Sequence, residues 1–244
     1  GGLAERWGGG GAGGGGEGGG GPSAMAVGEK GWGRDADGRT AVHRAAAAGD
    51  EDGVRAGLTR CGEGSGVEDA QDEGGWAALH SAAAAGHLGC VRLLLEAGAL
   101  VDARNGSRAT ALMLAASKGR GECLGALLAG GADPLLRDRM GATALHRAAA
   151  QGRIPEVRAL LGARQGRGAA RVGDVEECTP VHLAAAEGHL EVLKALLESA
   201  VSGGGEEGLE ACRAARNRDD KTPEAMALDS RTADFIRRFG EEVW

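Results

Sequence analysis

The sequence predicts an all-α solenoid of about six helix-turn-helix units with a C-terminal cap, and three observations support this fold class. A short turn motif recurs at spacings of 33 to 43 residues. A glycine follows each of the first five motifs, and two adjacent apolar residues, usually leucines, follow each of these glycines. One such unit cannot bury its apolar side alone. We therefore expect the units to stack and share one core.

The turn motif marks the start of the first helix in each unit. It places Thr or Ala before small and apolar residues and often His, as in Thr40-Ala41-Val42-His43. Thr can cap the free amides of a first helical turn, and His can bond back across the turn. The Thr or Ala positions are 40, 77, 110, 143, 179 and 222, which are separated by 37, 33, 33, 36 and 43 residues.

Each first helix is expected to be slim and each second helix apolar. Alanine runs such as 45–48 and 82–85 let neighbouring units approach. A glycine lies nine residues after each of the first five Thr or Ala positions, where the helix must end with a positive φ. Leucine pairs at 94–95, 127–128, 160–161 and 196–197, with Gly57-Leu58 in the first unit, are expected to bury against the next unit.

The repeat domain is expected over residues 34–244. Its units lie near 36–66, 72–104, 105–137, 138–173, 174–208 and 217–241. The longer spacings predict enlarged surface loops at Cys61–Gly66, Gly162–Gly173 and Ser202–Gly208. In the last unit, Lys221-Thr222-Pro223-Glu224 is expected to start a helix, and Phe235–Phe239 to form the cap.

Residues 1–33 have the composition of a disordered tail. The chain of 244 residues contains 47 glycines, and 14 of them lie within the first 21 positions. Such a segment loses much backbone entropy on folding and offers few apolar side chains in return. Its glycine run at 11–16 fits GxGxxG, but no strand precedes it and no amphipathic helix follows, so a nucleotide-binding loop is not expected.

Composition excludes several classes of partner. The chain carries 28 Lys and Arg against 35 Asp and Glu, a net charge of −7, which argues against a nucleic-acid-binding face. No apolar run approaches the roughly 18 to 20 residues of a membrane span. The five cysteines form no CxxC pair, so neither a disulfide framework nor a zinc site is expected, and a reducing compartment is favoured.

The units resemble the ankyrin repeat, whose T-P-L-H-x-A signature and 33-residue period are matched over roughly residues 34–240. Several segments are also similar to gankyrin-type ankyrin-repeat proteins, which associate with the proteasome regulatory particle. Trp76 after Gly75, and Arg147-Ala148-Ala149-Ala150, are not demanded by the general repeat consensus. The six units correspond to all but the first unit of that family.

The resemblance implies a non-catalytic assembly chaperone of the proteasome regulatory particle. Its concave face would bind the C-terminal domain of one ATPase subunit and release it as the particle matures. It further implies a monomer in the cytoplasm and nucleus, with no cofactor and with no nucleic-acid or membrane partner. A general ankyrin-repeat adaptor in signalling or transcription is the alternative, with the same fold and a different partner.

Charges beside the turn motifs are the candidate binding residues. Hairpin tips and first helices are expected to line the concave face, and their charge changes from acidic to basic and back to acidic along the chain. Tip charges that only maintain solubility are the alternative interpretation. The resemblance places binding charges at Asp37, Arg39, Glu73, Lys118 and Glu187. The full predicted set is Asp37, Arg39, Glu73, Trp76, Arg108, Lys118, Arg139, Arg147 and Glu187.

An enzyme is the rival class. His43, His80, His146 and His182 occupy the same turn of different units, and stacked helices lie about 10 Å apart, too far to share one metal. We therefore expect these histidines to be structural. Cys178 near His182 suggests a thiol nucleophile, but no third residue is placed to orient the imidazole. We expect no catalytic, cofactor-binding or metal-binding residues.

Overall fold

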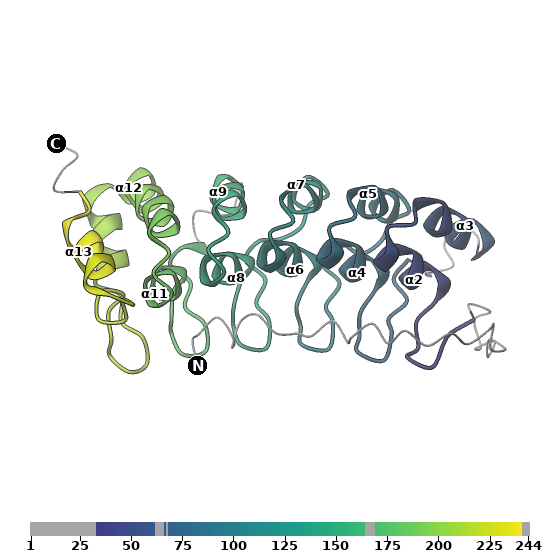
Figure 1. Ribbon diagram of the computed structural model, residues 1–244, viewed down its shortest axis with the longest axis horizontal. Coiled ribbons are helices and arrows are strands. Elements are labelled where there is room, and N and C mark those ends of the chain that lie inside the picture. Colours follow the sequence, from purple (N-terminus) through teal and green to yellow (C-terminus); the bar gives the residue numbers. More distant parts are fainter. Residues whose placement is uncertain (1–32, 62–65, 67, 164–168, 241–244) are drawn as a thin grey trace.

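The computed structural model describes residues 33–61, 66, 68–163 and 169–240. Within these residues eleven helices form an elongated stack of two rows, and hairpin loops project beyond the inner row (Figure 1). The inner row consists of α2 (Ala41–Ala48), α4 (Ala78–Ala85), α6 (Ala111–Lys118), α8 (Ala144–Ala150) and α11 (Pro180–Ala186). The outer row consists of α3 (Glu51–Cys61), α5 (Leu88–Glu96), α7 (Gly121–Ala129), α9 (Ile154–Gly162) and α12 (Leu190–Arg213), and α13 (Ser230–Arg238) closes the stack.

The packing of neighbouring units confirms the predicted all-α solenoid. Each inner helix packs against the outer helix of its own unit and against the next inner helix, from α2 on α4 to α8 on α11. Alanines at these contacts, such as Ala46, Ala82 and Ala148, are fully buried. Their small side chains let the inner helices pack closely, which is the role predicted for the alanine runs.

The core is a continuous apolar layer between the two rows. Leu94, Leu127, Leu160 and Leu196, the first members of the predicted leucine pairs, are all buried in it. Burying one leucine side chain stabilises the fold by about 2 kcal/mol. Because each of these leucines belongs to the layer shared by successive units, the core joins the units into one stack.

A glycine with a left-handed backbone follows each inner helix, as predicted. The φ angles are +76° at Gly49, +93° at Gly86, +69° at Gly119, +66° at Gly152 and +71° at Gly188. Contact with the next unit also requires a glycine, because a Cβ on Gly152 would lie 2.9 Å from the ring of His189, and a Cβ on Gly86 would lie 2.7 Å from Arg120. Glycine therefore satisfies both the backbone turn and the contact between units.

Two predictions for the C-terminal part are wrong. Ser202–Gly208 is exposed up to Glu207 and buried at Gly208, but it is not a loop, because it lies inside α12, which is broken only at Gly205 (φ +59°, ψ −145°). The helix resumes because Gly208 allows a close approach: a Cβ there would lie 2.3 Å from the carbonyl oxygen of Ala200. Leu209 then joins the core.

The second wrong prediction concerns Lys221-Thr222-Pro223-Glu224, which forms a turn instead of starting a helix. The backbone N–H of Met226 donates to the carbonyl oxygen of Thr222 at 3.1 Å. The helical part of the last unit is therefore α13 alone.

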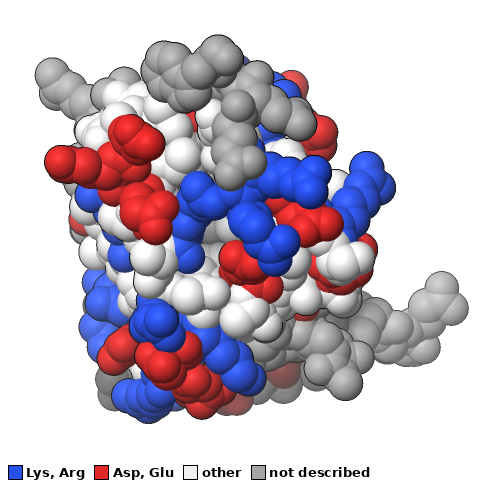
Figure 2. Space-filling model, turned by 90° about the vertical axis from the view of Figure 1, so that its left-hand side faces the viewer, with Lys and Arg blue, Asp and Glu red and all other residues white. Residues whose placement is uncertain are grey.

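The α13 helix caps the C-terminal end. Ile236 is buried in the core, and the ring centroids of Phe235 and Phe239 lie 5.6 Å apart beside it. On the outer side Arg237 pairs with Glu224 and Asp234. Figure 2 looks onto this end of the stack and shows basic and acidic side chains interspersed across it. A polar outer surface of this kind is typical of the capping unit of a repeat array.

The predicted tail at residues 1–33 lies, but for Gly33, outside the described residues, as do residues 62–65 and 164–168 of the predicted loops. The tail and the limits of the domain and its units therefore stay predictions. Within the described ranges no helix has both the length and the apolar character needed to cross a bilayer.

Candidate protein-binding face

Each unit begins with a tip whose shape depends on one Asp or Asn side chain. The first to sixth tips are residues 35–39, 72–76, 105–109, 138–142, 174–178 and 217–221. In the second tip, Asp72 Oδ1 accepts the backbone N–H groups of Gly74 (2.9 Å) and Trp76 (2.8 Å). The same pair of bonds recurs at Asp35, Asn105, Asp138, Asp174 and Asn217.

The sequence analysis missed this feature, although it leaves a clear signal. An Asp or Asn stands five residues before every Thr or Ala position of the turn motif. Side chains of Asp and Asn favour such turns because they hydrogen-bond the backbone a few residues further on. The tips are therefore specified locally, unit by unit.

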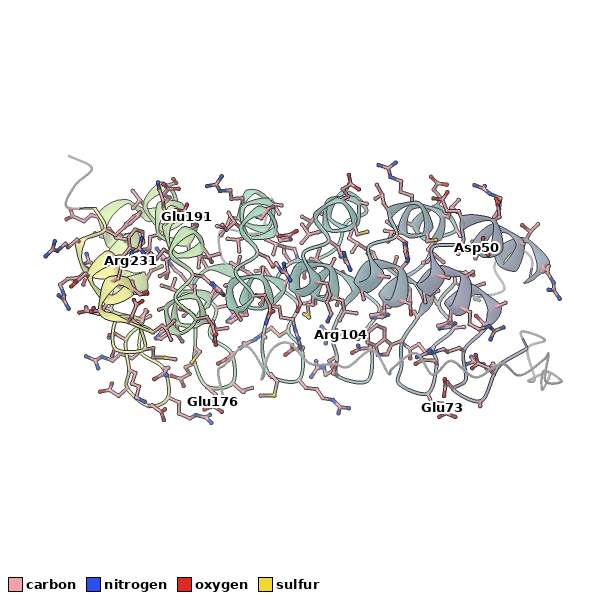
Figure 3. The ribbon with its side chains drawn as sticks, viewed as in Figure 1. Asp50, Glu73, Arg104, Glu176, Glu191 and Arg231 are labelled. Carbon is pink, nitrogen blue, oxygen red and sulfur yellow. The ribbon has the colours of Figure 1, made fainter. Side chains whose placement is uncertain are left out.

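Backbone hydrogen bonds join the tips into one row. The N–H of Glu73 donates to the carbonyl oxygen of Asp37 (3.1 Å), and the N–H of Gly106 donates to that of Gly74 (2.8 Å). The row continues with bonds from Arg139 to Ser107, from Val175 to Met140 and from Arg218 to Glu176. Figure 3 labels Glu73 and Glu176 on this row, below the helices. Side chains on successive tips therefore keep fixed neighbours.

Histidines at the starts of the inner helices support the row from behind. The N–H of Thr40 donates to His43 Nδ1 (3.2 Å), which leaves the ring proton on Nε2, and Nε2–H donates to the carbonyl oxygen of Trp76 in the next unit (2.8 Å). Equivalent bonds run from His80 to Ala109, from His146 to Cys178 and from His182 to Lys221. The predicted structural role of these four residues is confirmed.

These histidines are held in the neutral form. Burial lowers the pKa of all four, and brings that of the fully buried His146 to about 4. The bond to the Cys178 carbonyl and the nearby Asp138 raise the pKa of His146, whereas Arg137 lowers it. A proton on Nδ1 would break the bond from the N–H of Thr143 and place a charge in the core.

Five of the predicted binding residues lie exposed on the tip row. They are Asp37, Arg39, Glu73, Arg108 and Arg139. Arg39 also pairs with Asp72 of the next tip, with 3.3 Å between Nε and Oδ2, and its side chain stays 50% exposed. The row is thus acidic at Asp37 and Glu73, with Arg39 between them, and basic at Arg108 and Arg139.

The other four predicted residues are not brought into this row of exposed side chains. Trp76 is half-buried, with its ring centroid 6.0 Å from that of His80. Arg147 is 14% exposed and pairs with Asp138, with 2.6 Å between its guanidinium and Oδ2, so it holds the fourth tip from behind. Lys118 and Glu187 stand at the far ends of α6 and α11, roughly 12 Å from the tips by the rise of an eight-residue helix.

Three tips hold a charged residue where backbone geometry favours glycine. The fourth residue of every tip has a positive φ, and the first, second and fourth tips use Gly38, Gly75 and Gly141 there. The third, fifth and sixth tips use Arg108 (+61°), Glu177 (+61°) and Asp220 (+59°) instead. Each such residue costs about 1 kcal/mol or more, and strain of this kind is concentrated at functional sites.

Comparison with known families agrees with this geometry. The family profile described as Ankyrin repeats (3 copies) matches residues 25–105, 42–138 and 112–204, which together span more than half of the chain. The chain belongs to the ankyrin-repeat family. No curated protein matches it. Ankyrin arrays are protein-interaction modules, so the chain is a protein-binding module, and the tip row and the inner helices are its candidate binding face.

The histidines and the cysteine considered as an enzyme site are not arranged as a metal or nucleophile site in the described part of this ankyrin array. No three His, Cys, Asp or Glu side chains are grouped there as metal ligands. Cys178, the candidate nucleophile, is buried. Both ring nitrogens of its candidate base, His182, are engaged by Thr179 and Lys221. His182 is therefore unavailable to activate the thiol.

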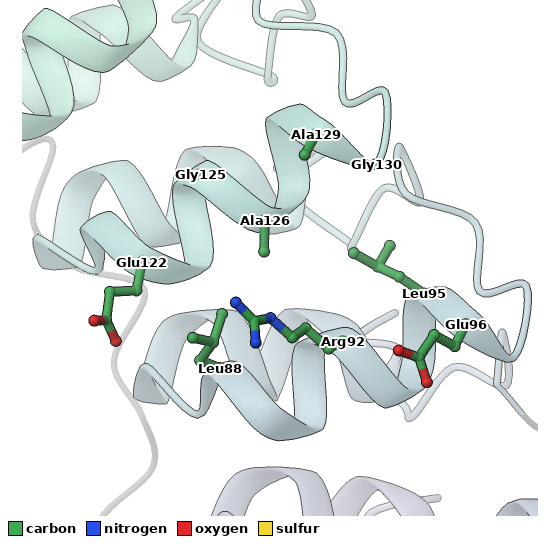
Figure 4. A pocket seen from close by; sticks show the side chains of 9 residues that line it. All are labelled: Leu88, Arg92, Leu95, Glu96, Glu122, Gly125, Ala126, Ala129 and Gly130. Atoms are coloured by element: carbon green, nitrogen blue, oxygen red, sulfur yellow. The ribbon is translucent and has the colours of Figure 1, made fainter.

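A groove on the outer row is separate from the binding face. It lies between α5 and α7, has a volume of about 610 Å³, and is lined by Leu88, Leu95 and Ala126, with Arg92 also at the groove (Figure 4). Gly125 also lines the groove, at the position where the other outer helices of the ankyrin array have a long basic side chain. Those residues are Arg55, Arg92, Arg158 and Lys194.

Proposed function

We propose that this ankyrin-repeat protein is an assembly chaperone of the proteasome regulatory particle, which holds the C-terminal domain of one ATPase subunit on its tip row and inner helices. The observation that carries the proposal is the ordered charge of the tip row, in which acidic Asp37 and Glu73 precede basic Arg108 and Arg139. Complementary charge across an interface steers association and sets its register. No catalytic step is part of this function.

The resemblance to gankyrin-type proteins supports the proposal through residues that shape the face. Trp76 and Arg147 are the two features that the general repeat consensus does not require. The ring of Trp76 lies beside that of His80, with the centroids 6.0 Å apart, and Arg147 pairs with Asp138 of the fourth tip. Both side chains contact residues that hold the tips in place, which favours a face of similar shape.

The proposed partner presents charges opposite to those of the row. Its surface is basic where it meets the first two tips and acidic where it meets the third and fourth. We further propose that the protein acts as a monomer in the cytoplasm and nucleus.

The first experiment measures binding to purified C-terminal domains of the regulatory-particle ATPase subunits by isothermal titration calorimetry. The charge-reversal variant is Lys118→Glu with Arg139→Glu. Lys118 is exposed at the end of the inner helix α6, and Arg139 is exposed on the fourth tip. We expect this variant to bind roughly tenfold or more weakly, because each reversal replaces an attraction by a repulsion.

The matched control reverses the same number of charges on the outer row, at Arg92→Glu with Lys194→Glu, and should leave affinity within about twofold. Circular dichroism verifies that both variants stay folded. Absence of binding to every ATPase domain refutes the proposal and favours the general adaptor, especially if co-purification recovers a kinase or a transcription factor alone. Equal weakening in both variants refutes the assignment of the face.

A further inference from the structure

Two apolar side chains lie next to each other in the middle of the charged tip row. Met140 is the third residue of the fourth tip, and Val175 is the second residue of the fifth tip. The N–H of Val175 donates to the carbonyl oxygen of Met140 at 3.0 Å, so the two residues are direct neighbours. Their exposed fractions are 36% and 39%. We call them the apolar pair.

No other two neighbouring tips place apolar side chains next to each other, and all six tips lie in the described residues. The second and third positions of the tips otherwise hold only charged, polar or very small residues. They are Ala36, Asp37, Glu73, Gly74, Gly106, Ser107, Arg139, Glu176, Arg218 and Asp219. The apolar pair is therefore a local departure from the character of the row.

Opposite charges border the apolar pair. On one side the N–H of Arg139 donates to Ser107, which places Arg139 beside the tip that carries Arg108. On the other side Glu177 is exposed on the fifth tip. An apolar centre between a basic and an acidic border has the layout of a small protein-binding hot spot, in which polar groups surround a centre that loses its water.

Backbone strain is present at the same borders, as it is also at Asp220 of the sixth tip. Arg108 and Glu177 both have a φ of +61° at the tip position where Gly38, Gly75 and Gly141 occur in other tips. A glycine would be more stable at either site. The chain thus keeps charged side chains on both sides of the apolar pair at a cost in backbone energy, which is typical of residues retained for function.

We propose that the apolar pair, with Arg108 and Arg139 on one side and Glu177 on the other, determines which protein surface the array accepts. The occupant is a folded protein surface with one apolar side chain between a carboxylate, which meets the arginines, and a cation, which meets Glu177. This inference rests on the proposed function, so the occupant is the C-terminal domain of the ATPase subunit.

A second copy of the chain is the rival occupant. A strip that runs from basic through apolar to acidic is complementary to itself after a half-turn, as a twofold interface requires. In that arrangement the acidic Asp37 and Glu73 of the first two tips would face none of the described tips of the second copy, because a single described tip follows the fifth. A separate protein that spans the whole row satisfies more of its charges.

The test removes the apolar character and keeps the shape. The variant Met140→Gln with Val175→Thr is compared with the control Leu100→Gln with Val201→Thr, which makes the same kind of change at exposed apolar residues outside the tips. Calorimetry uses the purified C-terminal domain that binds the wild-type chain best. We expect roughly tenfold weaker binding for the tip variant and less than about twofold change for the control.

A second variant, Arg108→Gly, tests the border. It should raise the urea midpoint, because the left-handed backbone suits glycine, and should still weaken binding. Unchanged affinity of the tip variant, or of Arg108→Gly, overturns this inference and leaves the proposed function intact. Failure of the wild-type chain to bind any ATPase domain overturns the proposed function and with it this occupant. A wild-type dimer that the tip variant dissociates, measured by analytical ultracentrifugation, assigns the pair to a second copy and also overturns the inference.

Discussion

Acidification should destabilise the array through His146. This residue is fully buried, and its neutral ring accepts the N–H of Thr143 at Nδ1 and donates from Nε2 to the carbonyl oxygen of Cys178 in the next unit. A histidine in an unfolded chain has a pKa near 6.5, whereas burial lowers that of folded His146 to about 4. Between these two values the unfolded state binds a proton that the folded state does not.

The sign and size of the effect follow from this difference. Stability is fully present above about pH 6.5 and is lost as the pH falls from there towards about 4. A solution at about pH 5 is roughly 1.5 units below the pKa of histidine in the unfolded chain, which corresponds to about 2 kcal/mol of lost stability. His43, His80 and His182 act in the same direction, because burial also lowers their pKa.

The chain itself suggests the control. Met113 occupies the histidine position in the third unit, so His146→Met introduces a residue that this position already accommodates. Urea titrations of the wild type and the variant at about pH 8 and about pH 5, followed by circular dichroism, give the change in unfolding free energy of each. The wild type should lose about 2 kcal/mol more than the variant. Equal losses, or a wild type that gains stability at the lower pH, would refute the reasoning.

Three further outcomes are expected. Met113→His should raise the unfolding free energy by about 1 kcal/mol, because its Nε2–H can reach the carbonyl oxygen of Ala142 as its equivalents do in other units; a lower urea midpoint would contradict this. Gly152→Ala should destabilise the fold by at least about 1 kcal/mol, because φ is +66° and the ring of His189 lies 2.9 Å from the added Cβ. Gly125→Ala, whose added Cβ would approach no other part of the described structure within 4 Å, should instead stabilise α7 by roughly 0.5 kcal/mol or more. Thermal melts in which Gly125→Ala melts below Gly152→Ala would disprove this. Hydrogen exchange should be faster in α2 and α3 than in α6 to α9, because no described unit packs on the first one and α3 contains two glycines; equal protection would exclude fraying.

The sequence alone determined the repeat and the parts of each unit that depend on local geometry. The glycine after each inner helix, the Thr or Ala at its start and the buried leucine that follows appear at constant positions because each answers a need within one unit or between equivalent units. Gly49 and Gly188 illustrate this, with φ of +76° and +71° at corresponding places. The tip Asp or Asn belonged to the same class and could have been found.

Only the tertiary structure decided which side chains meet, both within a unit and between units. Arg147 has the charge of a binding residue, yet within its own unit it pairs with buried Asp138 of the tip. Gly208 belongs to a glycine-rich segment that reads as a loop, yet it is buried in α12, where an added Cβ would lie 2.3 Å from the carbonyl oxygen of Ala200. Met140 and Val175 are 35 residues apart and become neighbours only because successive tips are hydrogen-bonded. Residues that a local backbone conformation requires recur at a fixed spacing and can be recognised in the sequence. Side-chain contacts depend on how the helices and units pack together, and the packing of the whole core sets that arrangement.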